Sequence, residues 1–381
     1  MSLSPDINIR TVATKQDLRD FVEVPNRLYA DDPHYRAQLT MERLEHLDVK
    51  KNPYFKHSTH QLFIAYQNDK PVGRISAQID DLAQKDKTPR LGHFGFVDAR
   101  DASILQALLD KAEDWLRQQK VKTITGPYSL SINDEAGLLV EGFDSAPYMM
   151  MNYAPHWVGD ALEAHGYRQA KDLLAFHMHT NQDIPAAGRR IANKAAEHPE
   201  VSLRTLDKKH MKRDLDIVLK IFNEAWAENW GFVQMTADEI AYTARSMKPL
   251  IQPDLVWIAE IENEPTAMIV ALPNLNEALD GLGGRLFPFG WLKLLWRLKV
   301  KKMKTARILL MGVRKDQHNG FLGGALAVTV MERLHASLYA NGYKDTELSW
   351  VLDDNAPMIR LIKGSGAKFS KRYRIYQKDL T

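Results

Sequence analysis

Cysteine is absent from this chain of 381 residues. Its absence excludes a disulfide scaffold, a thiolate metal site, an iron–sulfur cluster and a cysteine nucleophile. Long apolar runs are missing too, because no stretch reaches the roughly 18 consecutive apolar residues of a membrane-spanning helix. Residues 1–5 lack the apolar core of a secretory signal. From these absences we expect a cytoplasmic protein.

Neither sign of charge dominates. The 51 Lys and Arg residues face 48 Asp and Glu residues, a formal net charge of +3 that does not favour a nucleic-acid partner. The 13 histidines include no His-x-x-x-His pair with a glutamate, so we expect no metal site. The composition, 45% apolar and 26% charged, is that of ordinary globular proteins, and the length suffices for two domains.

A weak internal repeat organises the chain. Residues 62–75 and 256–269 each have two alternating apolar runs around a polar turn, the pattern of an antiparallel hairpin. Each hairpin is followed by a strand, a helix, a strand, a second helix, a glycine and a final strand. This order, met twice, indicates a duplication. We therefore expect two domains, 1–185 and 200–381, joined by a polar, turn-rich segment.

The same pattern predicts the fold class. We expect an α/β (α+β) protein with two tandem domains, each a mixed, mainly antiparallel sheet flanked by helices. The second domain carries an insertion at 274–304, where the first has a shorter polar stretch.

A glycine-rich turn follows the strand predicted at 307–313 and opens a helix. Backbone N–H groups and the helix dipole at such a turn attract phosphate, and glycine lets the ligand approach. The alternative is a tight strand-to-helix connection whose glycines only permit close packing. The candidate phosphate-binding residues are Val313, Arg314, Gln317, Gly320, Gly323 and Gly324.

The element order and this loop resemble the GNAT superfamily of acyl-CoA N-acyltransferases. Gln317 and Gly320 match the first two positions of the superfamily's pyrophosphate loop, and Leu322 stands where a small residue is usual. Asn355 and Gly366 match a downstream motif. The resemblance implies a tandem GNAT-like protein that uses coenzyme A or an acyl-CoA as substrate.

Asn355 has two interpretations. It precedes a predicted helix with Pro357 in the first turn, as an N-cap residue does. The resemblance implies in addition that it contacts the cofactor.

Two departures from the superfamily stand out. Ile362 occupies the position where many members carry a tyrosine general acid, so the resemblance implies that Tyr373 or Tyr376 supplies the acid, or that none does. The first domain keeps the layout but has lost the glycine loop, since residues 98–101 contain no glycine.

A polar connection at 126–143 offers further catalytic candidates. Acyl transfer to an amine needs a base for the ammonium proton and donors for the oxyanion. Glu135 could act as the base, with Ser131 or Asn133 orienting the amine. The alternative is an ordered loop whose short polar side chains satisfy its own backbone.

The insertion mixes large apolar and basic side chains over 286–304. Trp291, Leu294, Leu295 and Leu298 can share one helical face, opposite the basic residues. Such a helix would rest on an anionic membrane surface as a peripheral contact, or cover an acyl chain. The alternative is a helix that packs on the core with a solvated basic face.

The resemblance implies an N-acyltransferase that moves an acyl group from acyl-CoA to an amine. Because the chain has no cysteine to carry the acyl group, we expect direct attack on the thioester. The enzyme's substrate would be a small molecule or a lipid-like molecule. Two alternatives stay open: a Fem-like aminoacyl or lipid-linked transferase, and a non-catalytic acyl-CoA or lipid-binding module.

Overall fold

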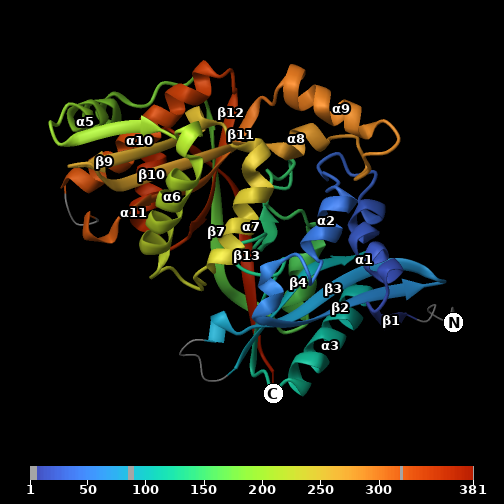
Figure 1. Cartoon of the computed structure of the whole chain (residues 1–381). Coiled ribbons are helices and arrows are strands. Elements are labelled where there is room, and N and C mark those ends of the chain that lie inside the picture. The colour runs from blue at the N-terminus through green and yellow to red at the C-terminus, as the bar shows by residue number, and fades with distance from the viewer. Residues whose placement is uncertain (1–6, 85–89, 318–320, 381) are drawn as a thin grey trace. The chain divides into compact units, whose positions relative to one another are not determined.

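The computed structural model describes residues 7–84, 90–317 and 321–380 (Figure 1). The chain forms two compact units, each assembled from separate segments. Unit 1 comprises residues 1–173, 278–300 and 371–381, and unit 2 comprises 174–277 and 301–370. The predicted domains, 1–185 and 200–381, were defined by the internal repeat, whereas the two units are defined by packing. The domain limits therefore stay a prediction.

The sheet of unit 1 has the strand order β1-β2-β3-β4-β5-β13, with β6 also paired to β13. Neighbouring strands run antiparallel except for β4 and β5, which are parallel. This is the expected mixed, mainly antiparallel sheet. Its strands are β1 (Asn8–Thr11), β2 (Ser58–Gln67), β3 (Lys70–Asp80), β4 (Leu91–Ala99), β5 (Thr123–Gly126), β6 (Leu138–Glu141) and the later part of β13 (Lys368–Asp379).

Helix α3 of unit 1 begins at a polar cap and buries one apolar face. Asp101 accepts a hydrogen bond from the N–H of Ile104 and so caps α3, which buries Ile104, Leu108 and Leu109 among others. This is the helix expected after the first hairpin and its following strand. The helices are α1 (Lys15–Leu28), α2 (Thr40–His46), α3 (Ala102–Gln118), α4 (Trp157–Ala164) and α9 (Gly290–Trp296).

The sheet of unit 2 has the order β7-β12-β11-β10-β9-β8. β11 and β12 are parallel, and β8, β9, β10 and β11 pair antiparallel. The strands are the later part of β7 (Arg168–His179), β8 (Val201–Thr205), β9 (Val256–Ile261), β10 (Glu264–Pro273), β11 (Thr305–Val313) and β12 (Asp345–Leu352). The helices are α5 (Ala186–Ala196), α6 (Met211–Trp226), α7 (Ala237–Met247), α10 (Phe321–Ala340) and α11 (Ala356–Gly364), with the short α8 (Leu275–Leu279) at the border with unit 1.

The two predicted hairpins are present as β2–β3 and β9–β10. Their turns adopt the same backbone conformation without glycine: Asn68 and Asp69 have φ of 51° and 57°, and Glu262 and Asn263 have φ of 52° and 67°. Two left-handed non-glycine residues in a row are uncommon. Their recurrence at matching positions supports the duplication.

β11 and β12 separate along their length. They pair from Thr305 and Asp345 as far as Ile308 and Leu348, and the ladder ends there. The rest of each strand continues without its neighbour, so an opening forms inside the sheet of unit 2.

Candidate functional site

A cavity of about 680 Å³ occupies this opening in unit 2. The separated parts of β11 and β12 form two of its walls, the first turn of α10 and α11 close it, and the end of α6 contributes aromatic side chains. Every lining residue belongs to unit 2. A cavity of this volume is in the range that holds a small-molecule ligand.

Two of the predicted cofactor residues, Gly323 and Gly324, line the cavity from the first turn of α10. A Cβ on Gly323 would lie 2.1 Å from the carbonyl oxygen of Gln317, so glycine is required there for packing. A Cβ on Gly324 would meet no atom of the described residues within 4 Å. The packing interpretation therefore holds for Gly323, whereas Gly324 keeps the cavity open.

Val313 and Asn355 line the same cavity. Asn355 Oδ1 accepts a 3.1 Å hydrogen bond from the N–H of Met358, which confirms it as the cap of α11. The side chain thus caps a helix at the edge of the cavity, so both interpretations of this residue remain compatible.

Two further cofactor candidates, Arg314 and Gln317, lie between β11 and the end of the described stretch at 317. The Arg314 guanidinium lies 3.6 Å from a Glu224 carboxylate oxygen and 3.3 Å from one of Asp316. Gln317 ends a short 3-10 turn, Lys315–Gln317. Gly320 lies outside the described residues. A bound pyrophosphate would therefore compete with these carboxylates for Arg314.

Ile362 lines the cavity and is 2% exposed. The position that the GNAT resemblance associates with a tyrosine is therefore an apolar wall. A proton donor or acceptor must come from another residue.

A buried polar group backs the cavity where β11 and β12 separate. Ser349 lines the cavity, and its hydroxyl donates a 2.6 Å hydrogen bond to Glu347 Oε1. Arg307 Nε donates a 2.8 Å hydrogen bond to the same hydroxyl. Glu347 and Arg307 are 1% and 2% exposed. The arrangement joins a residue of the cavity wall to a buried carboxylate.

Aromatic rings line another wall. Trp226 and Trp350 contact each other edge to face, with ring centroids 5.1 Å apart, and Trp230 lies on the same lining. Trp226 also donates to the Met311 carbonyl through its ring nitrogen, at 3.3 Å. Trp350, Ser349 and Glu347 were not among the candidates from sequence, because strand alternation alone does not mark a cavity wall.

Glu135 belongs to unit 1 and is 6% exposed. Gln38 donates to it at 2.7 Å, and the Arg43 guanidinium lies 3.3 Å from the same oxygen. Burial raises the pKa of Glu135, but Arg43, His46 and hydrogen bonds from Gln38 and Ser129 outweigh burial and hold it below its usual value. The carboxylate is thus a stable anion and a weak base.

The other two catalytic candidates also belong to unit 1. The Asn133 N–H donates to Ser131 Oγ at 3.1 Å, a local contact of the kind the loop interpretation expects. The Tyr376 hydroxyl donates to Glu163 at 3.4 Å, and burial above all raises the pKa of Tyr376 to about 12. Tyr376 is therefore protonated at neutral pH. The roles of Glu135, Asn133 and Tyr376 stay predictions.

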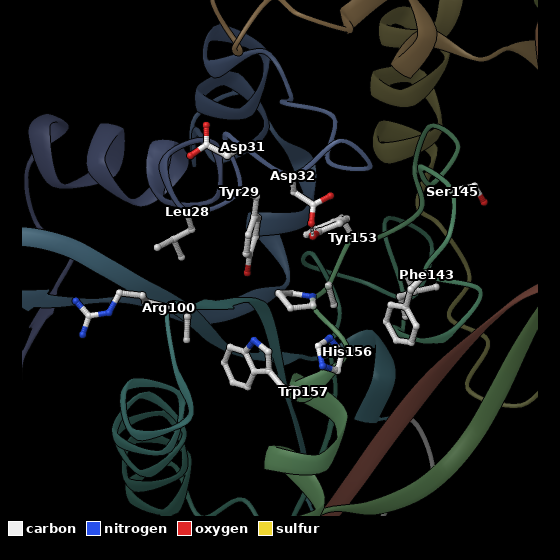
Figure 2. A pocket seen from close by; sticks show the side chains of 14 residues that line it. Leu28, Tyr29, Asp31, Asp32, Arg100, Phe143, Ser145, Tyr153, His156 and Trp157 are labelled. Atoms are coloured by element: carbon white, nitrogen blue, oxygen red, sulfur yellow. Dashed lines mark hydrogen bonds between the residues drawn. The ribbon is translucent and has the colours of Figure 1, made fainter.

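Unit 1 holds a cavity of its own, of about 500 Å³ (Figure 2). Tyr29, Tyr153 and Trp157 line it together with Asp32 and His156. The Tyr153 hydroxyl donates a 2.5 Å hydrogen bond to Asp32. Burial raises the pKa of Asp32, but this bond and the one from the His34 N–H outweigh burial and hold the pKa below its usual value. An ionised carboxylate among aromatic rings suits a cationic ligand.

One cluster of described residues has ligands suited to a metal ion. His177 and His179 alternate on β7, so both reach the same face as Asp345 of β12, and their ligand atoms lie within 4.8 Å of one another. The two histidines have strand spacing rather than the helical spacing of a His-x-x-x-His motif, so the sequence pattern gave no sign of this group. No helix of the described residues is long and apolar enough to cross a membrane.

Two known proteins are similar to this chain over nearly its whole length. No family model matches the chain. The chain is 41% identical over 381 residues to the bacterial ceramide synthase of Caulobacter vibrioides, covering all of this chain and 99% of that protein. It is 40% identical over 374 residues to protein YghO of Escherichia coli, covering 98% and 95%.

Solved structures show the same architecture at low identity. A tandem GNAT protein from the clavulanic acid biosynthesis pathway matches 99% of this chain and 99% of its own, with a TM-score of 0.60 and 12% identity. A GCN5-related N-acetyltransferase from Sphaerobacter thermophilus matches 98% and 96%, with a TM-score of 0.53 and 14% identity. These matches confirm the predicted fold class. The chain has the tandem GNAT fold and belongs to the same family as the bacterial ceramide synthase of Caulobacter vibrioides and protein YghO.

Proposed function

We propose that this protein transfers the acyl group of an acyl-CoA to the amine of a long-chain amino alcohol and so makes a ceramide-type lipid. The observation that carries the proposal is the 41% identity to a bacterial ceramide synthase over the full length of both chains. The tandem GNAT fold is in keeping with transfer to an amine.

The cavity in unit 2 is our candidate site for the acyl-CoA. Its first α10 turn, with Gly323 and Gly324, offers backbone N–H groups and a helix dipole to the pyrophosphate. The stretches of β11 and β12 beyond their shared ladder can receive the extended arm that carries the thioester. Trp226, Trp350 and Met331 give the cavity apolar surface for the start of an acyl chain.

The reaction would proceed by direct attack, since the chain has no cysteine to carry the acyl group. The neutral amine adds to the thioester carbonyl, the carbon–sulfur bond breaks, coenzyme A leaves as the thiolate, and the amine loses one proton. Ser349, backed by Glu347, is our candidate to pass that proton from the cavity to a buried carboxylate. Glu135 remains the rival base predicted from sequence.

The test combines binding and turnover. Thermal shift with coenzyme A, acetyl-CoA and palmitoyl-CoA reports binding, because a ligand of the folded state raises its melting temperature. Mass spectrometry then follows palmitoyl-CoA with sphinganine, with glycine and spermidine as competing amines. We expect an N-acyl product from sphinganine alone. Binding without any product would support the non-catalytic module, and no binding of any CoA would support the Fem-like alternative.

A further inference from the structure

An apolar face on the segment 285–300 points into solvent. Seven large apolar side chains of this segment are between 45% and 78% exposed, and no residue of α9 is buried. They are Phe287, Phe289, Trp291, Leu292, Leu295, Trp296 and Val300. A contiguous stretch of this kind marks a contact surface in a folded protein. The alternative of a helix that packs on the core with a solvated basic face is thus wrong for α9.

In this segment a charged side chain contacts the protein and the apolar side chains face solvent. Arg297 Nη1 donates to the carbonyl oxygens of Ala278 and Asp280, at 2.7 and 2.5 Å. The guanidinium therefore holds the segment to its own unit, whereas the tryptophan and leucine side chains beside it face outward. A helix that covers a core shows the opposite arrangement.

The segment is held in place at its start. The N–H of Thr40 donates to the Gly284 carbonyl at 3.0 Å, and Arg36 pairs with Asp280 at 3.4 Å. Gly284 has φ of 74°, and a Cβ there would lie 2.4 Å from the Asn26 side chain. The N–H of Trp291 closes a turn onto Leu286 at 2.8 Å. Unit 1 thus presents the apolar face on a fixed base.

Charge on the segment has a single sign. Residues 281–304 contain no Asp or Glu, and Arg285, Lys293 and Lys299 are exposed among the apolar side chains. Aromatic and aliphatic side chains bordered by cations match the interface of an anionic bilayer, where rings enter the headgroup level and cations meet phosphate. A second copy of this chain would bring the same cations face to face.

We propose that the segment 285–300 docks the protein on the surface of an anionic phospholipid bilayer. Phe287, Phe289, Trp291 and Trp296 enter the headgroup region, and Lys293 and Lys299 contact lipid phosphates. The docking does not rest on the proposed reaction, because it needs neither acyl-CoA nor amine.

Co-sedimentation tests this docking. The full chain is mixed, without acyl-CoA or amine, with vesicles of phosphatidylcholine alone or of equimolar phosphatidylcholine and phosphatidylglycerol. We expect binding to the anionic vesicles that weakens with salt and falls about tenfold or more in the double variant Trp291→Glu/Trp296→Glu. The variant Lys293→Glu/Lys299→Glu should lose the preference for phosphatidylglycerol.

The matched control is Tyr339→Glu, which places the same charge at another exposed aromatic residue, 62% exposed on α10. It should bind like the unmodified chain. Circular dichroism checks that the tryptophan variant folds. If it does not, the variant Leu292→Glu/Leu295→Glu is used in its place. Equal binding by all variants, or no binding to anionic vesicles, would overturn the proposal. Light scattering that shows a dimer dissociated by Trp291→Glu/Trp296→Glu, without vesicle binding, would assign the face to a second copy.

Discussion

The hydroxyl of Ser349 lies 2.6 Å from a carboxylate oxygen of Glu347, its neighbour two residues back along β12. Adjacent positions on one strand face opposite sides, so residues two apart share a face. Arg307, opposite Glu347 on β11, donates to the same hydroxyl. The strand spacing thus joins the hydroxyl of a cavity-lining residue to a buried carboxylate.

If Glu347 receives the amine proton, Glu347→Gln should lower kcat about 10²- to 10⁴-fold, because general-base catalysis contributes that much. Ser349→Ala should lower kcat as well while leaving Arg307 beside its carboxylate. Coenzyme A binding, followed by thermal shift, should persist in both. Glu135→Gln is the matched control: a large loss of kcat there, with Glu347→Gln fully active, would move the base to unit 1.

The two glycines of α10 should respond differently to substitution. Gly323→Ala should destabilise the protein by about 1–3 kcal/mol, because the new Cβ would overlap the Gln317 carbonyl oxygen. Gly324→Ala should fold at least as well as the unmodified chain, since glycine in a helix costs about 0.5–1 kcal/mol relative to alanine. Urea unfolding measures both.

Gly324→Leu then tests the cavity. Its side chain would extend into the open space, so binding of coenzyme A should weaken about tenfold or more with little change in melting temperature. Titration calorimetry with coenzyme A measures the loss. Unchanged affinity would place the ligand away from the first turn of α10.

The Glu135 ion pair predicts a pH dependence of stability. The pKa of Glu135 in the folded state is below its ordinary value of 4.5. Between the folded and unfolded pKa values, the folded state therefore binds fewer protons than the unfolded state. The stabilisation is complete above the unfolded pKa and is lost as the pH falls through the folded pKa. The free energy of unfolding should therefore decline more steeply on acidification in the unmodified chain than in Glu135→Gln. Parallel curves from about pH 3 to pH 7 would contradict the ion pair.

Asp172 offers a test of packing within unit 1. It is 2% exposed and accepts from Arg372 at 3.0 Å and from Arg374 at 2.9 Å. Asp172→Asn should destabilise the protein by about 3 kcal/mol, because two partly buried guanidinium groups lose their anion. Glu141→Gln, at the exposed partner of Arg372, should cost less than about 1 kcal/mol. Equal losses in urea unfolding would mean that burial does not distinguish the two pairs.

Local patterns predicted the regular elements well. Alternating apolar residues identified both hairpins, and the capped helix at α3 followed from apolar spacing after Asp101. The glycine turn before α10 pointed to Val313, Gly323 and Gly324, and the downstream motif pointed to Asn355; all four line one cavity. These features depend on residues close together in the chain, whose side-chain preferences determine the local backbone.

Contacts between distant segments were beyond prediction from one sequence. The cavity exists because β11 and β12 stop pairing after Ile308. No residue type in the sequence indicates where that pairing ends. The metal-type cluster joins His177 and His179 to Asp345 across neighbouring strands. The outward face of α9 depends on Arg297 reaching two carbonyl groups, whereas its helical spacing also fits a packed helix.

The order of segments has a consequence for synthesis. The later part of β13 pairs with β5, with Tyr376 opposite Gly126, yet all of unit 2 precedes it in the chain. A ribosome must therefore translate unit 2 before the sheet of unit 1 can close. Through that interval the edge of β5 is an unpaired strand edge, which invites pairing with other nascent chains. Chains interrupted before residue 371 would keep that edge open, so incomplete products should aggregate and be removed by proteolysis.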